Sequence, residues 1–154
     1  MNLKYVVFDV DGVFTNGQFI YDEIGKRYKT FGPHDSDGLK LLRLAGLQVE
    51  AISADKRGFA ITEKRMNDMD VPLKLVSEQD RVSYIKERGN LHETCFMGDG
   101  HFDSKVFEFV RYSIAPSNAV EITRLKADHV TSSCGGSGAV YEAALHILNL
   151  NGES

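Results

Sequence analysis

Tryptophan is absent from this sequence of 154 residues, and cysteine occurs only twice. Cys95 and Cys134 are far apart and lack the CxxC spacing of metal and redox motifs, so the sequence predicts neither a disulfide framework nor a zinc site. We expect both thiols to be reduced and Cys95 to lie in the core.

Long apolar runs and clusters of basic residues are also missing. The first apolar run is ended by acids after a few residues, which is too short for a signal peptide or a membrane span. The formal net charge of −4, without any run of Lys or Arg, argues against nucleic acid as a partner. We therefore expect a cytoplasmic protein that binds neither nucleic acid nor membrane.

What the sequence does contain is an alternation of short apolar runs with segments of helical periodicity. This pattern is typical of an α/β fold, in which helices cover both faces of a mainly parallel sheet. The chain is long enough for one core and too short for two ordinary domains, so we predict a single domain over residues 1–154. The predicted strands are residues 3–8, 47–52, 71–76, 94–97, 112–115 and 129–131, and the predicted helices are residues 38–45, 58–69, 78–88, 103–110, 119–126 and 139–150.

Two helix ends carry sequence signals of their own. Asn118, with Glu121 three residues later, resembles a capping box at the start of a helix. Gly89 stands where a helix would stop. These signals predict a helix start near residue 118 and a helix end near residue 89.

One segment, residues 17–31, breaks the alternation. Two apolar stretches, 17–21 and 27–31, flank a polar turn that contains a glycine, and this pattern predicts a β-hairpin after the first strand. The apolar side chains of the hairpin are Phe19, Ile20, Tyr21, Tyr28 and Phe31. An isolated ribbon cannot hide that much apolar surface, so the hairpin must pack on its own domain or on a neighbouring subunit.

Acidic residues follow two of the predicted strands, at the edge where parallel α/β sheets bind ligands. Asp9 and Asp11 follow the first strand and project to the same side, because residues two apart in extended backbone share a face. One carboxylate could attack phosphorus while the other transfers protons. Asp99 and Asp103 follow the fourth strand, and converging carboxylates predict a cation, for which oxygen ligands favour Mg²⁺.

A hydroxyl and a cation follow two further strands. Ser53 comes after the second strand and Arg81 lies near the start of the helix after the third, and both suit the oxygens of a transferring phosphoryl group. Simpler interpretations stay open: the Asp-Gly pairs could be turns, Ser53 a helix cap, and Arg81 the partner of Glu78 or Glu87 on a solvated helix face.

The order of these elements resembles the four motifs of the haloacid dehalogenase superfamily. The matching residues are Asp9 and Asp11, Ser53, Arg81, and Asp99 with Asp103. The chain is most similar to a cap-less branch of phosphatases acting on octulosonate 8-phosphate or nonulosonate 9-phosphates, which also includes C-terminal modules of acylneuraminate cytidylyltransferases. This resemblance is carried by DVDGVFTNG with its hairpin, by FGPHDSDGL at residues 31–39 and by GGSGAV at residues 135–140.

The resemblance implies a Rossmann-like three-layer sandwich, a bound Mg²⁺ and a homotetramer in which neighbours help to close the site. It implies that Asp9 and Asp99 bind Mg²⁺ with the backbone carbonyl of Asp11, and that Asp103 supports the water shell of the metal. The third motif of the branch usually supplies lysine, where this chain has Arg81. Lys74 and Lys86 are alternative cations for that role.

The residues that would contact the sugar differ from the octulosonate enzymes. Those enzymes typically carry arginines where this chain has His34 and Ser137, and they often have a second aspartate where it has Gly100. We take His34, Arg57 and Ser137 as candidate substrate-binding residues, with a solvated loop as the simpler interpretation of each.

Two functions are consistent with these observations. The first is a Mg²⁺-dependent phosphate monoester hydrolase that acts on a small phosphorylated sugar acid, through an aspartyl-phosphate on Asp9. The second is a weak or inactive assembly module associated with the activation of acidic sugars, as the resemblance to the cytidylyltransferase modules implies.

Overall fold

The computed structural model describes residues 1–153, and Ser154, the last residue of the predicted domain, lies outside the described residues. Six strands form one sheet in the order β5-β4-β1-β6-β7-β8, and all neighbouring pairs are parallel. The strands are β1 (Tyr5–Asp9), β4 (Gln48–Ser53), β5 (Leu73–Leu75), β6 (Thr94–Met97), β7 (Tyr112–Ala115) and β8 (His129–Val130). The predicted α/β fold is therefore confirmed.

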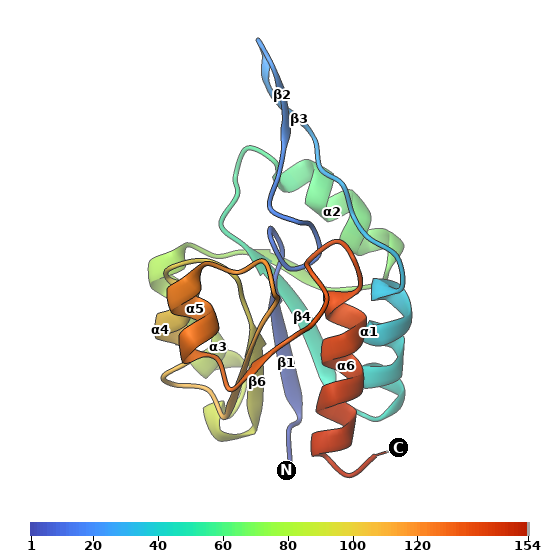
Figure 1. Ribbon diagram of the computed structural model, residues 1–154, viewed down its shortest axis with the longest axis vertical. Coiled ribbons are helices and arrows are strands. Elements are labelled where there is room, and N and C mark those ends of the chain that lie inside the picture. Colours follow the sequence, from blue (N-terminus) through green and yellow to red (C-terminus); the bar gives the residue numbers. More distant parts are fainter. Residues whose placement is uncertain (154) are drawn as a thin grey trace.

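Helices cover both faces of this sheet (Figure 1). They are α1 (Asp35–Leu44), α2 (Phe59–Asp68), α3 (Arg81–Arg88), α4 (Asp103–Val106), α5 (Glu121–Lys126) and α6 (Ala139–Leu150), with 3-10 turns at η1 (Glu78–Asp80) and η2 (Leu91–Glu93). The helices α1 and α6 lie side by side on one face, and α3, α4 and α5 lie on the other (Figure 1). Within the described residues, no helix is both long enough and apolar enough to cross a membrane.

The side chains of β1 alternate between two buried clusters. Val6 and Phe8 pack toward α1 and α6, whereas Tyr5 and Val7 join the cluster on the side of α3 and α4. Because successive residues of a strand point to opposite faces, a strand buried on both sides must be apolar throughout, as this one is until it reaches Asp9. Asp9 is the last residue of β1, which lies between β4 and β6 in the sheet. It therefore lies at the carboxyl edge of the sheet, near its middle.

Several element boundaries match the sequence prediction and others differ: α4 ends at Val106 rather than at residue 110, and β1 and β4 begin and end one or two residues later than predicted. The strands 94–97 and 112–115 and the helix 139–150 are as predicted, and Gly89 does follow the end of α3. The predicted capping box is wrong, because α5 begins after Val120, which makes no side-chain cap. Asn118 instead connects two loops: its amide donates to the Gly12 carbonyl oxygen at 3.0 Å, and its oxygen accepts from the Gly135 nitrogen at 2.7 Å.

The predicted hairpin is present as an antiparallel pair, β2 (Ile20–Asp22) and β3 (Gly25–Tyr28). It projects from the body of the molecule (Figure 1). Tyr21, Ile24 and Tyr28 are 55%, 77% and 62% exposed, so its own domain leaves the apolar tip uncovered.

Candidate active site

The carboxyl ends of β1, β4 and β6 converge on a cavity of about 380 Å³. Asp9, Asp11, Arg81, Asp99 and Asp103 all line this cavity. Parallel strands bring these residues together, because their carboxyl ends meet at one edge of the sheet although the residues are distant in sequence.

Three of the acids form a tight cluster. Asp9, Asp99 and Asp103 each offer a carboxylate oxygen, and these oxygens all lie within 4.8 Å of one another. Burial raises the pKa of Asp9 well above its ordinary value; Arg81 opposes this shift, and Asp103 and Asp99 add to it. Burial, followed by the charge of Asp103, raises the pKa of Asp99 to about 6. An oxygen-only cluster whose members repel one another suits a hard cation such as Mg²⁺.

Gly12 makes room for this cluster. Its φ is +85°, a conformation that residues with a side chain rarely adopt, and a Cβ there would stand 1.8 Å from the Asp99 Oδ2. The glycine of the DxDG sequence is thus required both by the backbone turn and by the approach of Asp99. The turn interpretation of Asp11-Gly12 and its place in the site are therefore compatible.

Arg81 is the cation within the cluster. Its Nη2 donates to the Asp9 Oδ1 at 3.2 Å, and its Nη1 forms an ion pair with the Asp103 Oδ1. The residue is 4% exposed, so the alternative of a solvated partner for Glu78 or Glu87 is wrong. Burial works against the charge, yet Asp9 and Asp103 raise the pKa of Arg81 above its ordinary value.

The two alternative lysines lie elsewhere. Lys74 and Lys86 are exposed, and neither lines the cavity. Of the described residues that line this cavity, Arg81 is the one cation.

Asp103 also shapes the loop that carries Asp99. Its Oδ2 accepts hydrogen bonds from the backbone nitrogens of Asp99 and Gly100, both at 3.0 Å. With its Oδ1 paired to Arg81, this carboxylate joins the loop after β6 to the start of α3.

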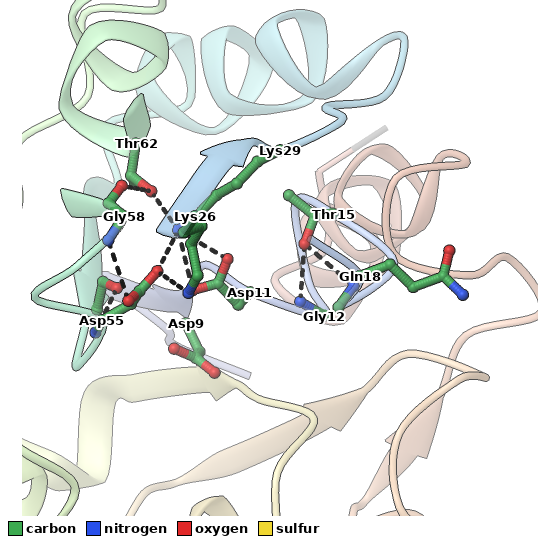
Figure 2. A network of polar contacts seen from close by, with 12 residues as sticks. Asp9, Asp11, Gly12, Thr15, Gln18, Lys26, Lys29, Asp55, Gly58 and Thr62 are labelled. Atoms are coloured by element: carbon green, nitrogen blue, oxygen red, sulfur yellow. Dashed lines mark hydrogen bonds and ion pairs between the residues drawn. The ribbon is translucent and has the colours of Figure 1, made fainter. Parts of the chain in front are cut away.

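Asp11 belongs to a second polar network, drawn in Figure 2. Lys29, which follows β3, lies 2.9 Å from the Asp11 Oδ1, and it donates to the Asp11 Oδ2 at 3.1 Å and to the Thr62 Oγ1 at 2.8 Å. The ammonium groups of Lys29 and Lys26 lie 2.9 and 2.7 Å from the Asp55 Oδ2. Burial would raise the pKa of Asp55, but hydrogen bonds from these lysines and from the Gly58 nitrogen lower it to about 2.

Sequence reasoning missed Lys26, Lys29 and Asp55. The position of Asp55 was a usable signal, because it follows β4 by two residues as Asp11 follows β1. The lysines gave no such signal, since nothing in their spacing shows that they contact Asp11 and Asp55.

Ser53 lies at the end of β4, as predicted, but behind the cavity. It is 1% exposed, its Oγ accepts a hydrogen bond from the Asp55 nitrogen at 3.1 Å, and Ala54 and Asp55 line the cavity in its place. It does not cap α2, whose first turn follows Gly58.

The structure does not bring the three candidate substrate-binding residues into this cavity. His34 precedes α1 with φ of 66° and lines a separate surface pocket with Tyr141. Arg57 is exposed in the turn before α2, and Ser137 is exposed in the loop before α6. These residues would contact a ligand bound at the acid cluster only in the site of a neighbouring subunit or after a conformational change of their own loops.

Asp35, the first residue of α1, is buried at 1% exposure. Neither of its carboxylate oxygens has a hydrogen-bond partner among the described residues, and it makes no side-chain cap. Burial raises the pKa of Asp35 to about 7, with Arg65 opposing the shift.

Comparison with known proteins agrees with this geometry. The model of the haloacid dehalogenase-like hydrolase family matches residues 50–143. A 3-deoxy-D-manno-octulosonate 8-phosphate phosphatase of Haemophilus influenzae is 35% identical, over 99% of this chain and 87% of its own length. The similarity thus extends over nearly the whole chain and includes the hairpin.

Two solved structures have the same fold. The cobalt-bound form of the Haemophilus influenzae phosphatase has a TM-score of 0.84 at 34% identity, covering 98% of this chain and 90% of its own. A Moraxella catarrhalis 3-deoxy-D-manno-octulosonate 8-phosphate phosphatase, in complex with magnesium, phosphate and its sugar acid, has a TM-score of 0.86 at 27% identity. The match with the Moraxella catarrhalis structure covers 96% of this chain and 87% of that one.

Proposed function

Because the chain belongs to the haloacid dehalogenase-like hydrolase family and is a phosphoric monoester hydrolase of it, we propose that it is a Mg²⁺-dependent, single-domain phosphatase of a small phosphorylated sugar acid. The observation that carries this proposal is the convergence of Asp9, Asp99 and Asp103 around Arg81 at one sheet edge. A phosphoryl group needs a nucleophile and compensating positive charge in one place, and this cluster offers both.

In this proposal Asp9 and Asp11 divide the chemistry. An oxygen of Asp9 attacks phosphorus, the bond from phosphorus to the sugar oxygen breaks, and Asp11 gives that oxygen its proton. Asp11 then removes a proton from water, which attacks the phosphorus of the aspartyl-phosphate, so that inorganic phosphate leaves and Asp9 is restored. Arg81 holds Asp9 in place through its Nη2 and contributes positive charge beside the reacting phosphorus.

The donor set fits a resident Mg²⁺. Asp9 and Asp99 would hold it, with the backbone carbonyl of Asp11, while Asp103 would support its water shell. When bound, the metal would supply positive charge that offsets repulsion between the anionic nucleophile and the anionic substrate. Ser53, behind the cavity, would support the backbone of Ala54 and Asp55 at the cavity wall.

Relatives that act on octulosonate 8-phosphate support the choice of a sugar acid. His34 and Ser137 stand where the octulosonate enzymes typically carry arginines, so a nonulosonate 9-phosphate is the alternative substrate. Arg81 is the one cation among the described residues that line the cavity, and it is already paired with two acids. A substrate carboxylate would therefore need a cation from a neighbouring subunit, which fits the homotetramer expected from the resemblance.

The exposed hairpin tip supports that assembly. Ile20, Tyr21, Ile24 and Tyr28 together present an apolar surface that water would otherwise solvate. Light scattering coupled to gel filtration should give a tetramer for the wild type and a smaller species for Ile24→Asp with Tyr28→Asp, whereas a monodisperse wild-type monomer would contradict the proposal. A cytoplasmic location belongs to the same proposal, and the free thiols of Cys95 and Cys134 are compatible with it.

Phosphate release tests the activity. Octulosonate 8-phosphate, nonulosonate 9-phosphates, hexose phosphates and 4-nitrophenyl phosphate should be assayed with Mg²⁺ and with a chelator. We expect turnover of a sugar acid phosphate that requires Mg²⁺ and is lost in Asp9→Asn. Wild-type turnover in Asp9→Asn would refute the aspartyl-phosphate mechanism. Absence of turnover on every substrate, together with no stabilisation by Mg²⁺, would favour the assembly module.

A further inference from the structure

Lys29 differs from the rest of the hairpin to which it is attached. The preceding residues Arg27 and Tyr28 are exposed, whereas the side chain of Lys29 is 0% exposed. Its ammonium group contacts Asp11 after β1, Asp55 after β4 and Thr62 in α2 (Figure 2). One side chain thus joins the hairpin to three segments at the edge of the site.

The contacts of Lys29 explain why it can be buried. A buried ammonium group is expensive unless charges and hydrogen bonds compensate for the lost water. Here two carboxylates and one hydroxyl surround it at 2.8 to 3.1 Å. Lys26 balances the second carboxylate, because it also lies on Asp55, with its own ammonium 3.5 Å from the centre of the Phe19 ring.

Lys29 contacts both oxygens of Asp11, which lines the cavity and whose side chain is 21% exposed. A carboxylate side chain that is partly exposed has several rotamers, and a bond to a buried group selects one of them. Each carboxylate oxygen has two lone pairs, so the contacts with Lys29 do not use every acceptor position of Asp11. The Oδ1 itself is buried.

We propose that Lys29 is a positioning residue, which holds the carboxylate of Asp11 toward the cavity. Proton transfer by Asp11 then depends on the position of the hairpin that carries Lys29. This inference rests on the proposed function, in which Asp11 protonates the leaving oxygen. Lys29 touches neither substrate nor phosphorus; it acts through Asp11.

The leaving group of the substrate distinguishes positioning from a general structural role. A sugar alkoxide is a strong base and leaves only when protonated, whereas 4-nitrophenolate is a weak base and leaves without a proton. A misplaced Asp11 therefore lowers kcat/KM for the sugar phosphate more than for the aryl phosphate, since general acid catalysis is worth about 10²- to 10⁴-fold.

The experiment compares Lys29→Met with Lys26→Met on octulosonate 8-phosphate and 4-nitrophenyl phosphate. For Lys29→Met we expect kcat/KM to fall about tenfold to a hundredfold on the sugar phosphate and less than about threefold on the aryl phosphate. Lys26→Met is the matched control, because it removes a hairpin lysine from Asp55 without touching Asp11, and the ratio of the two kcat/KM values should stay as in the wild type. Equal losses on both substrates, or no loss on either, would overturn the proposal.

Three further variants, Asp11→Asn, Asp9→Asn and Thr62→Val, distinguish failure of the positioning role from failure of the proposed function. Asp11→Asn should lose more activity on the sugar phosphate than on the aryl phosphate, as we expect for Lys29→Met. If Asp11→Asn shows this difference and Lys29→Met does not, the positioning role is refuted while the proposed function stands. If Asp9→Asn retains turnover, the proposed function itself fails. If Lys29→Met does not fold, Thr62→Val provides the test, because it removes one hydrogen bond that orients Lys29. Thr62→Val should shift the ratio of kcat/KM values in the same direction as expected for Lys29→Met. An unchanged ratio in Thr62→Val would refute the positioning role.

Discussion

Arg81 is predicted to stabilise the fold as well as the site, and its removal tests the electrostatics of the acid cluster. In Arg81→Met, Asp9 and Asp103 keep their buried positions but lose their shared counter-charge. Breaking a buried ion pair by removing one partner costs about 3–5 kcal/mol. We therefore expect the free energy of unfolding in a chelator to fall by about that amount.

Urea unfolding followed by circular dichroism at neutral pH measures this loss. Lys126→Met is the control, because its partner Glu108 is 57% exposed and a surface pair is worth about 1 kcal/mol or less. Mg²⁺ should stabilise Arg81→Met more than the wild type, since the cation then supplies charge that the arginine no longer does. A loss in the chelator no larger than that of the control would refute the electrostatic interpretation.

Two further predictions concern groups outside the acid cluster. Burial raises the pKa of Asp35 to about 7 from 3.8, so between these pH values the folded state holds a proton that the unfolded state has lost, and stability falls as pH rises. Unfolding curves from pH 4 to 8 should show about 4 kcal/mol less of this fall in Asp35→Asn than in the wild type, because the raised pKa values of Asp9 and Asp99 contribute to the fall in both proteins; parallel curves for the two proteins would contradict the shift. Asn118→Ala should lose about 1–3 kcal/mol, because it leaves the Gly12 oxygen and the Gly135 nitrogen without a partner, and a change below about 0.5 kcal/mol in thermal unfolding would show that water replaces the amide.

The sequence was sufficient to predict the sheet and the acids because both depend on local patterns. A buried parallel strand must be apolar along its length, so the runs that end at Asp9 and before Asp99 identify β1 and β6 directly. The topology of a parallel sheet then brings the ends of these strands together without further information. Arg81 was placed by the same rule, at the start of the helix after β5.

The sequence was not sufficient to predict the role of a side chain that contacts segments distant in the sequence. Asn118 has the spacing of a cap, but the loops that contain Gly12 and Gly135 use its amide instead. Asp35 precedes the predicted helix of residues 38–45, yet it is the first residue of α1 and is buried without a hydrogen-bond partner among the described residues. Such choices depend on which loops meet in space, and a single sequence does not give the loop conformations.

The hairpin carries both the exposed tip that we propose for assembly and the lysine that contacts Asp11. Its tip is exposed and apolar at Ile24 and Tyr28, whereas Lys29, the next residue after Tyr28, is buried against Asp11. In the proposed tetramer, a neighbouring subunit packed on Tyr28 would restrain the backbone of Lys29. Variants at the tip that only weaken assembly should then alter the same ratio of kcat/KM values as Lys29→Met, because both loosen the position of Asp11. A tip variant that dissociates the protein and leaves this ratio unchanged would separate assembly from the position of Asp11.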